Sequence, residues 1–316
     1  MKTLIKKNLY YYNDQQGEFD SKRGVKRFMG GTGVIAGGAP AGSPASGTSD
    51  DIEYLQIGTL GNTIDWGGEL FQSTSFCMGV GGDGHRGILS VGGTPSLTSM
   101  EWVNFASKGD ATDYGEATTN VDNGQGASNG HRGMWCDGNG GPGPKANLYY
   151  VDFGSMGTAA DFEGDRAAGY GPACASDGVR AVWQGGHPSS NDIIDYVNMG
   201  VHGGNSTDFG ECNLDEHYKV GCSNGYRGLY CGGGANEAME YVTIGTAGVG
   251  RDFGELHAAM GQGNVVSDGS RGVICNGFGT ADPQIMDFVN IGVAQKAAFY
   301  GNARRSAYTT ANMSGN

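Results

Sequence analysis

One phrase recurs along the chain at a nearly constant spacing, and it limits the possible folds more than any other feature. It reads IEYLQIG from Ile52, MEWVNFA from Met100 and LYYVDFG from Leu148, and three further copies begin at residues 194, 239 and 286. Successive copies are 45 to 48 residues apart. Repetition at a period of roughly 40 to 50 residues is typical of stacked or circular repeat proteins. We therefore expect one array of six similar units.

Two further phrases accompany the copies. An aspartate before an aromatic residue follows eight or nine residues after the last apolar member of the first phrase, at Asp65, Asp113, Asp161, Asp208 and Asp252; the sixth copy has Phe299 instead. A turn phrase, [Asp/Asn]-Gly-x-Arg-Gly, then carries Arg86, Arg132, Arg180, Arg227 and Arg271, with a related Arg23 near the start of the chain. Asn-Gly and Asp-Gly between extended runs indicate β-hairpins whose two central residues both have positive φ.

The pattern of the first phrase predicts a strand that is covered on both sides. Tyr54 would lie on one face, and Leu55 and Ile57 on the other. A four-stranded blade packed between two neighbouring blades meets this condition. The sequence therefore predicts an all-β fold, a six-bladed β-propeller with repeats of about 47 residues, against a β-solenoid as the alternative.

The two ends of the chain predict how the ring closes. The sixth copy stops near its hairpin, whereas residues 20–31 contain the matching DSKRGV, so we expect the N-terminal strand to complete the C-terminal blade. Blades would start near residues 52, 100, 148, 194, 239 and 286, in a propeller spanning 20–316, with 32–51 as a flexible linker. Residues 1–19 would form a separate arm, whose basic and aromatic side chains are Lys2, Lys6, Lys7, Tyr10, Tyr11 and Tyr12. The arm is compatible with docking on a neighbouring subunit or with lying along the edge of blade six.

Charge and composition exclude several classes. A net charge of −13 disfavours nucleic acid as a partner, and no stretch is apolar enough for membrane insertion. The basic start lacks the apolar run of a signal peptide. The 7 cysteines form no CxxC pair and are expected to be reduced and buried, rather than disulfide-bonded or bound to metal.

The repeated Asp and Arg are the first candidates for a site, because one pair per blade could line a channel. Residues needed by every copy are more often needed by the fold, so we expect a structural role for them. The histidines form no metal-binding motif, and no nucleophile motif is present. We therefore expect no enzyme activity and no cofactor.

The variable position of the turn phrase is the candidate binding surface. Its residues are Lys22, His85, His131, Val179, Tyr226 and Ser270. Variable side chains on a constant frame describe either a recognition face or unconstrained solvent-facing positions.

The combined pattern I-[DE]-Y-V-x-I-G-T, x-D-F-G-E-L and S-[DN]-G-x-R-G-V with a Gly pair resembles the kelch-like repeats of virion structural proteins of tailed bacteriophages. The resemblance runs from about Asp20 to the end, with departures at Ala106, Glu163, Ala181 and Phe299. It implies a noncatalytic capsid decoration, neck, tail or fibre component, made in the host cytoplasm and located in the virion. Its partners would be other virion proteins, including copies of itself. The alternatives are a propeller that binds a host-surface glycan or receptor through its turns and, third, a kelch-type enzyme that uses copper.

Overall fold

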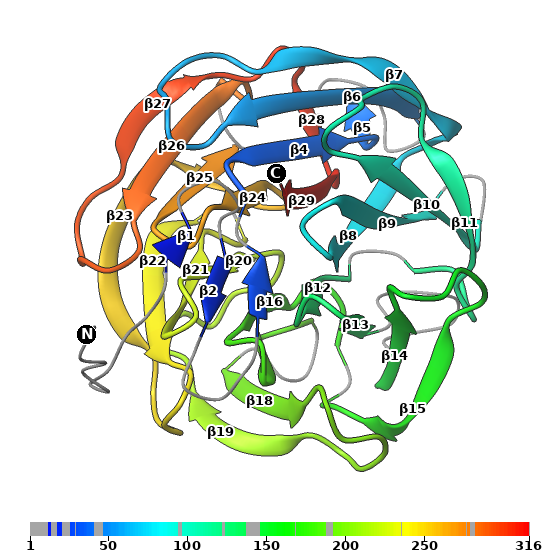
Figure 1. Cartoon of the computed structure of the whole chain (residues 1–316). Helices are drawn as coiled ribbons and strands as arrows, with labels where there is room; N and C mark the ends of the chain where they lie inside the picture. The colour runs from blue at the N-terminus through cyan, green and yellow to red at the C-terminus, as the bar shows by residue number, and fades with distance from the viewer. Residues whose placement is uncertain are drawn as a thin grey trace, which may run out of the picture.

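The structure is a computed structural model that describes residues 12–13, 18–20, 26–28, 30–40, 47–93, 97–121, 124–136, 146–167, 169–187, 192–234, 236–275, 277–278 and 282–315. Within these residues it contains six antiparallel four-stranded sheets arranged as blades around one axis (Figure 1). The predicted six-bladed β-propeller is confirmed.

Each blade consists of four strands, which are numbered below from the central axis outward. Blade 1 contains β29 (Ala311–Gly315), β4 (Thr32–Ala36), β6 (Ser49–Gln56) and β7 (Ile64–Thr74); blade 2 contains β8 (Phe76–Gly82), β9 (Arg86–Gly92), β10 (Ser99–Asn104) and β11 (Thr112–Glu116); blade 3 contains β12 (Gly126–Ser128), β13 (Arg132–Cys136), β14 (Asn147–Asp152) and β15 (Ala160–Asp165). Blade 4 contains β16 (Ala173–Ser176), β17 (Arg180–Gln184), β18 (Ile193–Asn198) and β19 (Thr207–Glu211); blade 5 contains β20 (Val220–Ser223), β21 (Arg227–Cys231), β22 (Asn236–Thr243) and β23 (Arg251–Met260); blade 6 contains β24 (Asn264–Ser267), β25 (Arg271–Cys275), β26 (Ile285–Asn290) and β27 (Ala298–Asn302).

Two smaller sheets complete the set. β28 (Ala307–Tyr308) pairs with β5 (Ala39–Pro40), and β1 (Tyr12–Asn13), β2 (Glu18–Asp20) and β3 (Lys26–Phe28) form a sheet of their own. The side chains of the predicted arm lie outside the described residues.

The predicted blade starts were out of phase with the blades. The recurring phrase of the sequence forms the third strand of a blade, and the Asp-aromatic phrase begins the fourth. The chain then crosses to the innermost strand of the next blade and returns outward through three hairpin connections. Sequence periodicity gives the length of a unit but is the same whichever strand is taken as the first, so it could not set the phase.

The ring is closed by one N-terminal and one C-terminal strand, but not by the predicted residues. β4, not residues 20–31, pairs with β29, and this pairing completes blade 1 rather than blade 6. The carbonyl of Gly31 accepts from Ile57 N–H (2.7 Å), as the turn residue Tyr226 accepts from Ile244 N–H (2.9 Å) in blade 5. Gly31 therefore occupies the position of the turn residue in blade 1, and Thr32 occupies the place of the repeated arginine.

The predicted linker 32–51 is also corrected, because it contains β4, β5 and the start of β6. Its many small residues suggested flexibility, but a strand that is covered on both faces can use small side chains. Val34 and Ala36 of β4 are fully buried between blades 1 and 2.

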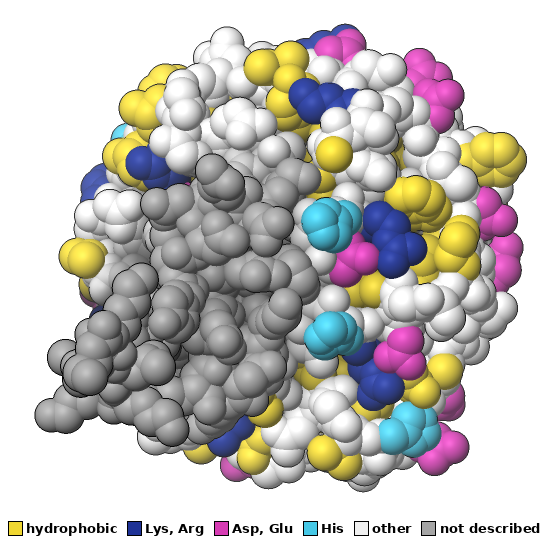
Figure 2. Space-filling view, in the orientation of Figure 1, with side chains coloured by type: hydrophobic (Ala, Val, Ile, Leu, Met, Phe, Trp, Pro, Cys, Tyr) yellow, Lys and Arg dark blue, Asp and Glu magenta, His cyan; other side chains and the backbone are white. Residues whose placement is uncertain are grey.

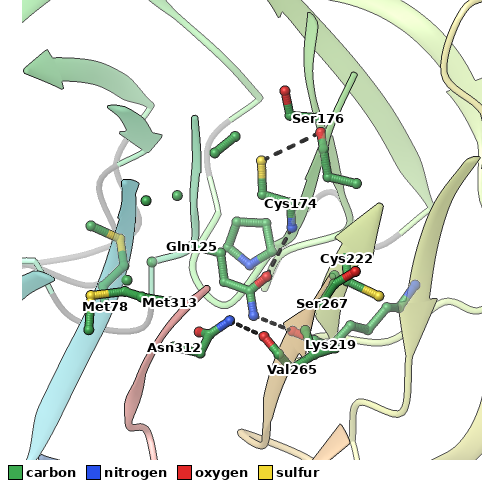
Figure 3. A pocket seen from close by; sticks show the side chains of 18 of the residues that line it. Met78, Gln125, Cys174, Ser176, Lys219, Cys222, Val265, Ser267, Asn312 and Met313 are labelled. Atoms are coloured by element: carbon green, nitrogen blue, oxygen red, sulfur yellow. Dashed lines mark hydrogen bonds between the residues drawn. The ribbon is translucent and has the colours of Figure 1, made fainter. Parts of the chain in front are cut away.

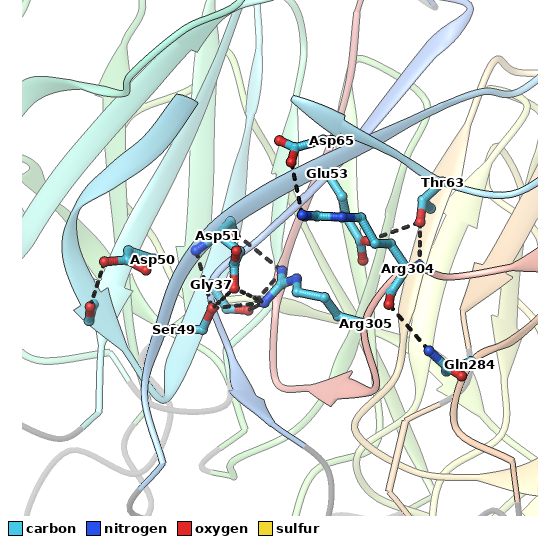
Figure 4. Close-up of polar contacts among 11 residues, drawn as sticks. Gly37, Ser49, Asp50, Asp51, Glu53, Thr63, Asp65, Gln284, Arg304 and Arg305 are labelled. Atoms are coloured by element: carbon cyan, nitrogen blue, oxygen red, sulfur yellow. Dashed lines mark hydrogen bonds and ion pairs between the residues drawn. The ribbon is translucent and has the colours of Figure 1, made fainter. Parts of the chain in front are cut away.

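Polar contacts between blade 1 and the segment after blade 6 also help to close the ring (Figure 4). Arg305, in the segment after blade 6, donates to Ser49 Oγ (2.8 Å) and Asp51 O (3.2 Å) in blade 1. The preceding Arg304 pairs with Asp65 (2.9 Å), and its backbone N–H donates to Thr63 Oγ1 (2.5 Å). Charge-assisted bonds thus hold the segment after blade 6 to the third and fourth strands of blade 1.

Candidate functional site

In blades 2 to 6, the first two strands are joined by one recurring turn. In blade 2, Asp83 Oδ1 accepts from the N–H groups of His85 (3.0 Å) and Arg86 (2.8 Å). Gly84 has a φ of 89°, whereas Asp83 and His85 do not have positive φ. The expectation of two positive-φ residues was therefore wrong. Glycine followed by a variable residue is the pattern of a type II′ turn, and the Asp or Asn before it caps the turn with its side chain.

In blades 2 to 6, the repeated arginine joins the blade to the next one. Arg132 Nη1 donates to Met199 O of blade 4 (3.1 Å), and its guanidinium carbon lies 4.1 Å from the ring centre of Tyr150 in its own blade. The other described copies do the same: Arg86 with Phe153 O and Trp102, Arg180 with Ile244 O and Tyr196, Arg227 with Ile291 O and Tyr241, and Arg271 with Ile57 O and Phe288. Arg23 lies outside the described residues. These contacts give the arginine a structural role between blades.

The repeated aspartate lies elsewhere, exposed on the outermost strand. In each copy its Oδ1 accepts from the N–H two residues later, at 2.7 to 3.2 Å, for Asp65, Asp113, Asp161, Asp208 and Asp252. The bond lies at a β-bulge in the pairing with the third strand, as between Met100 and Glu101 in blade 2. Among the described lining of the central cavity there is neither this aspartate nor the repeated arginine.

The hairpin turns lie on one face, which we call the hairpin face, because each turn joins the same ends of the first two strands in blades 2 to 6. His85, His131, Tyr226 and Ser270 are exposed there, and Val179 is half-buried. Lys22 lies outside the described residues, and the structure places Gly31 at the equivalent position of blade 1. Figure 2 shows histidines beside basic and acidic side chains on this face.

Apolar side chains surround the turns on the same face. They lie in the loops between the third and fourth strands, which emerge beside the turns because the ends of these third strands pair with the starts of the second strands. Five of these six loops carry a large apolar residue that is 55 to 61% exposed: Leu60, Met156, Val201, Val249 and Val293. In blade 2 the loop carries Lys108, whose Nζ lies 3.5 Å from the ring centre of Tyr54.

The innermost strands enclose a central cavity of about 230 Å³ (Figure 3). The side chain of Gln125 extends along its wall, where Oε1 accepts from Cys174 N–H (3.0 Å) and Nε2 donates to Lys219 O (3.1 Å). The end of the cavity beside the hairpin face carries serines from five blades: Ser128, Ser176, Ser223, Ser267 and Ser314. Lys219 is the one lining residue with a charged side chain in the described part, and its Nζ points away to Glu240 Oε1 (3.3 Å).

The cysteines of the cavity wall are poor nucleophiles. Burial raises the pKa of Cys77 and of Cys222 to about 12, and burial also raises that of Cys174. Thiols at neutral pH are then protonated and unreactive. All 7 cysteines are free and buried in the structure, as the sequence predicted.

A set of buried carboxylates in the third strands was not anticipated from the sequence: Glu53, Glu101, Asp195, Glu240 and Asp287. Each is satisfied differently: Glu101 accepts from Phe71 N–H (2.8 Å) and Gln72 N–H (3.1 Å), whereas Asp195 pairs with Arg166 (3.2 Å). The acid follows the first apolar residue of the phrase in all these copies, and this repetition is the sequence feature that could have identified the set. Their partners are backbone N–H groups, single cations and neighbouring side chains such as Thr63, Gln184 and Ser206, so these acids hold the outer strands in place.

A cluster of four rings, equally unanticipated, lies at the edge of blades 4 and 5. The ring centres of His187 and His217 are 4.9 Å apart, those of His187 and Tyr170 4.8 Å, and those of His217 and Tyr218 4.5 Å. Burial and the charge of His187 lower the pKa of His217. The four residues come from three loops, and only His217 and Tyr218 are adjacent in the sequence, so no sequence motif announces them.

The described residues contain no group of three or more His, Cys, Asp or Glu side chains that could hold a metal ion. No helix of the described chain is long and apolar enough to cross a membrane. No family model matches the chain, and no curated protein matches it either.

Proposed function

We propose that the protein is a noncatalytic assembly module that docks on protein partners through its hairpin face. The observation that carries the proposal is the combination on one face of variable turn residues and five exposed apolar side chains in equivalent loops. Apolar groups exposed together on one side of a soluble protein mark interaction sites. Tyr226, 64% exposed, adds an aromatic side chain of the kind that contributes most to interface energy.

The rigid frame favours this function. Each turn is capped by its own Asp or Asn, and the arginine after it bonds to the neighbouring blade. A face held in this way loses little conformational entropy on binding, so a partner can be bound tightly without further ordering.

The location that we propose for this module is the particle of a tailed phage. The support is the resemblance of the repeats to kelch-like virion proteins, and the partners would be other virion proteins or further copies of this chain. A host-surface receptor on the same face is the alternative, which the exposed His85, His131 and Tyr226 would serve.

The test compares two variants in purified particles. Leu60, Met156, Val201 and Val293 are changed to Ser on the hairpin face, and the control carries Phe71→Ser and Phe299→Ser, which are exposed on outer strands. We expect the first variant to melt like the wild type but to be incorporated at least about tenfold less, as measured by quantitative mass spectrometry. Unchanged incorporation would count against docking through this face. Absence of the wild-type protein from particles would contradict the virion role.

A further inference from the structure

The end of the cavity opposite the hairpin face has an unusual backbone, and we call this end the entry mouth. In four successive blades, the residue two places before the innermost strand has a left-handed conformation: Gly171 (φ 68°), Tyr218 (φ 60°), Gln262 (φ 54°) and Thr309 (φ 55°). They are connected in series, because Tyr218 N–H donates to Gly171 O (2.7 Å), Gln262 N–H to Tyr218 O (3.0 Å) and Thr309 N–H to Gln262 O (3.0 Å).

Three of these positions carry a side chain where glycine would be more stable. A left-handed conformation costs a non-glycine residue on the order of 1 kcal/mol, and more for β-branched threonine. Blade 4 uses Gly171 at the same place, so the connection itself does not require a side chain. Thr309 Oγ1 has a structural bond to Ser75 O (2.6 Å), which accounts for that residue. Tyr218 and Gln262 line the cavity and bond to each other through their side chains.

Aromatic rings extend from the mouth toward the edge of blades 4 and 5. Tyr218 is in contact with His217, and the ring centre of Tyr170 lies 5.8 Å from that of Tyr218. These residues are half-buried, so part of each side chain faces solvent. Their rings offer an apolar surface at the opening of a polar cavity.

One hydroxyl in the cavity wall has no partner within the described protein. Thr310 is 5% exposed and lines the cavity, and its Oγ1 forms no hydrogen bond. A buried hydroxyl without a partner costs about 1–3 kcal/mol. A hydrogen-bonding ligand or water in the cavity would remove this cost.

We propose that the entry mouth binds one ring of an uncharged sugar, which packs its apolar face on Tyr218 and hydrogen-bonds to Gln262 and Thr310. An anionic ligand is disfavoured because the ammonium group of Lys219 is held by Glu240, outside the cavity. A cationic ligand is disfavoured because no carboxylate is among the described lining residues. A purely apolar ligand would leave Thr310 unpaired. A neutral molecule with many hydroxyls and one apolar face fits all three observations, and the site is independent of the hairpin face.

The test is saturation-transfer NMR on the full chain with D-glucose, D-galactose and N-acetylglucosamine, and with sialic acid and glucosamine as charged counterparts. Thr310→Val replaces the hydroxyl with a methyl group of similar size. Because that hydroxyl is unpaired without ligand, the variant should be at least as stable as the wild type but bind the neutral sugar about fivefold or more weakly. Tyr218→Gly removes the ring and relieves the left-handed strain. Lys108→Gly relieves the same strain (φ 52°) on the hairpin face and is the matched control.

We expect at least one neutral sugar to give transfer signals that both cavity variants weaken and Lys108→Gly leaves unchanged. Binding of none of the three neutral sugars would overturn the proposal, as would equal binding by the wild type and Thr310→Val. Preferential binding of sialic acid or glucosamine would overturn the assignment of an uncharged ligand. A loss of stability in Thr310→Val would show that the hydroxyl has a structural partner and would also contradict it.

Discussion

The buried acids of the third strands show how one repeat position is adapted residue by residue. Asp195 pairs with a cation, Asp287 accepts from His257 N–H (2.8 Å), and Glu101 accepts from two backbone N–H groups of the outermost strand of the preceding blade. Burial without a neighbouring cation makes the charged form of a carboxylate less stable relative to its protonated form. Burial accordingly raises the pKa of Glu101 to about 7; the bonds from Phe71 and Gln72 lower it, and the charge of Asp113 raises it.

This pKa predicts that stability decreases as pH rises. In the unfolded chain the carboxyl titrates near 4.5, so between pH 4.5 and 7 the folded protein holds a proton that the unfolded chain has released. The stabilisation is fully present below pH 4.5 and is lost as pH rises through 7. Glu101 should therefore lower the free energy of unfolding by up to about 3 kcal/mol between pH 5 and 8. Urea unfolding at several pH values measures this.

Glu101→Gln tests this prediction, and Glu211→Gln is its control. The first should flatten the decrease between pH 5 and 7, although Glu53, whose pKa burial also raises, will keep part of it. The exposed Glu211 should have no such effect. Parallel curves for the wild type and Glu101→Gln would show that Glu101 does not carry the proton.

At the scale of the element, the glycine after the repeated arginine sets how closely two blades pack. A Cβ on Gly133 would lie 2.5 Å from Val80 Cγ1 of the preceding blade, and one on Gly33 would lie 2.5 Å from Val266 Cγ2. Blade 4 has Ala181 here, in the same core cluster as the small Ala127. The second strand therefore needs glycine where a larger side chain of the neighbouring innermost strand faces it.

Gly133→Ala should destabilise the protein by about 1–3 kcal/mol, because neighbouring side chains must shift to admit the methyl group. Gly154→Ala is the matched control, since nothing lies within 4 Å of its added Cβ, and it should change stability by less than about 0.5 kcal/mol. Adding Val80→Ala should recover part of the loss, which a double-mutant cycle would measure as a coupling energy. Additive effects would show that the two side chains do not compete for space.

The strands themselves could be predicted well, because turn residues and alternation are local signals. Asp83 and Gly84 announce a turn on their own, and the apolar residues of the third strand announce double coverage. The closing strand could not be found this way. Thr32 stands in the place of the arginine, whereas Arg23 and Gly24 imitate the motif, so the better local match lay in the wrong segment.

At the scale of the whole molecule, ring geometry brings together residues that no local pattern relates. His187 and His217 meet because blades 4 and 5 are neighbours, and the left-handed residues form a series only because the innermost strands surround one axis. The number of blades was predictable from the period, but the cavity and its mouth depend on which loops face the axis. For the same reason, the sequence could be searched for catalytic motifs without any indication that the fold contains a central cavity.

Because β4 and β29 close the ring, deletions at the two ends of the chain should differ in their effect on the melting temperature. Among the described residues, the strands of the six blades begin at Thr32, and β1 to β3 pair only with one another, so removing residues 1–29 should change the melting temperature by no more than about 2 °C.

Removing residues 311–316 takes away the innermost strand of blade 1, including the buried Ala311 and Met313. Met313 packs where blade 2 has Gly87, so the loss opens the contact between these blades. We expect the melting temperature to fall by at least about 10 °C, or cooperative unfolding to be lost. Differential scanning calorimetry of both deletions decides the point, since the reverse order of stability would mean that residues before Thr32 close the ring.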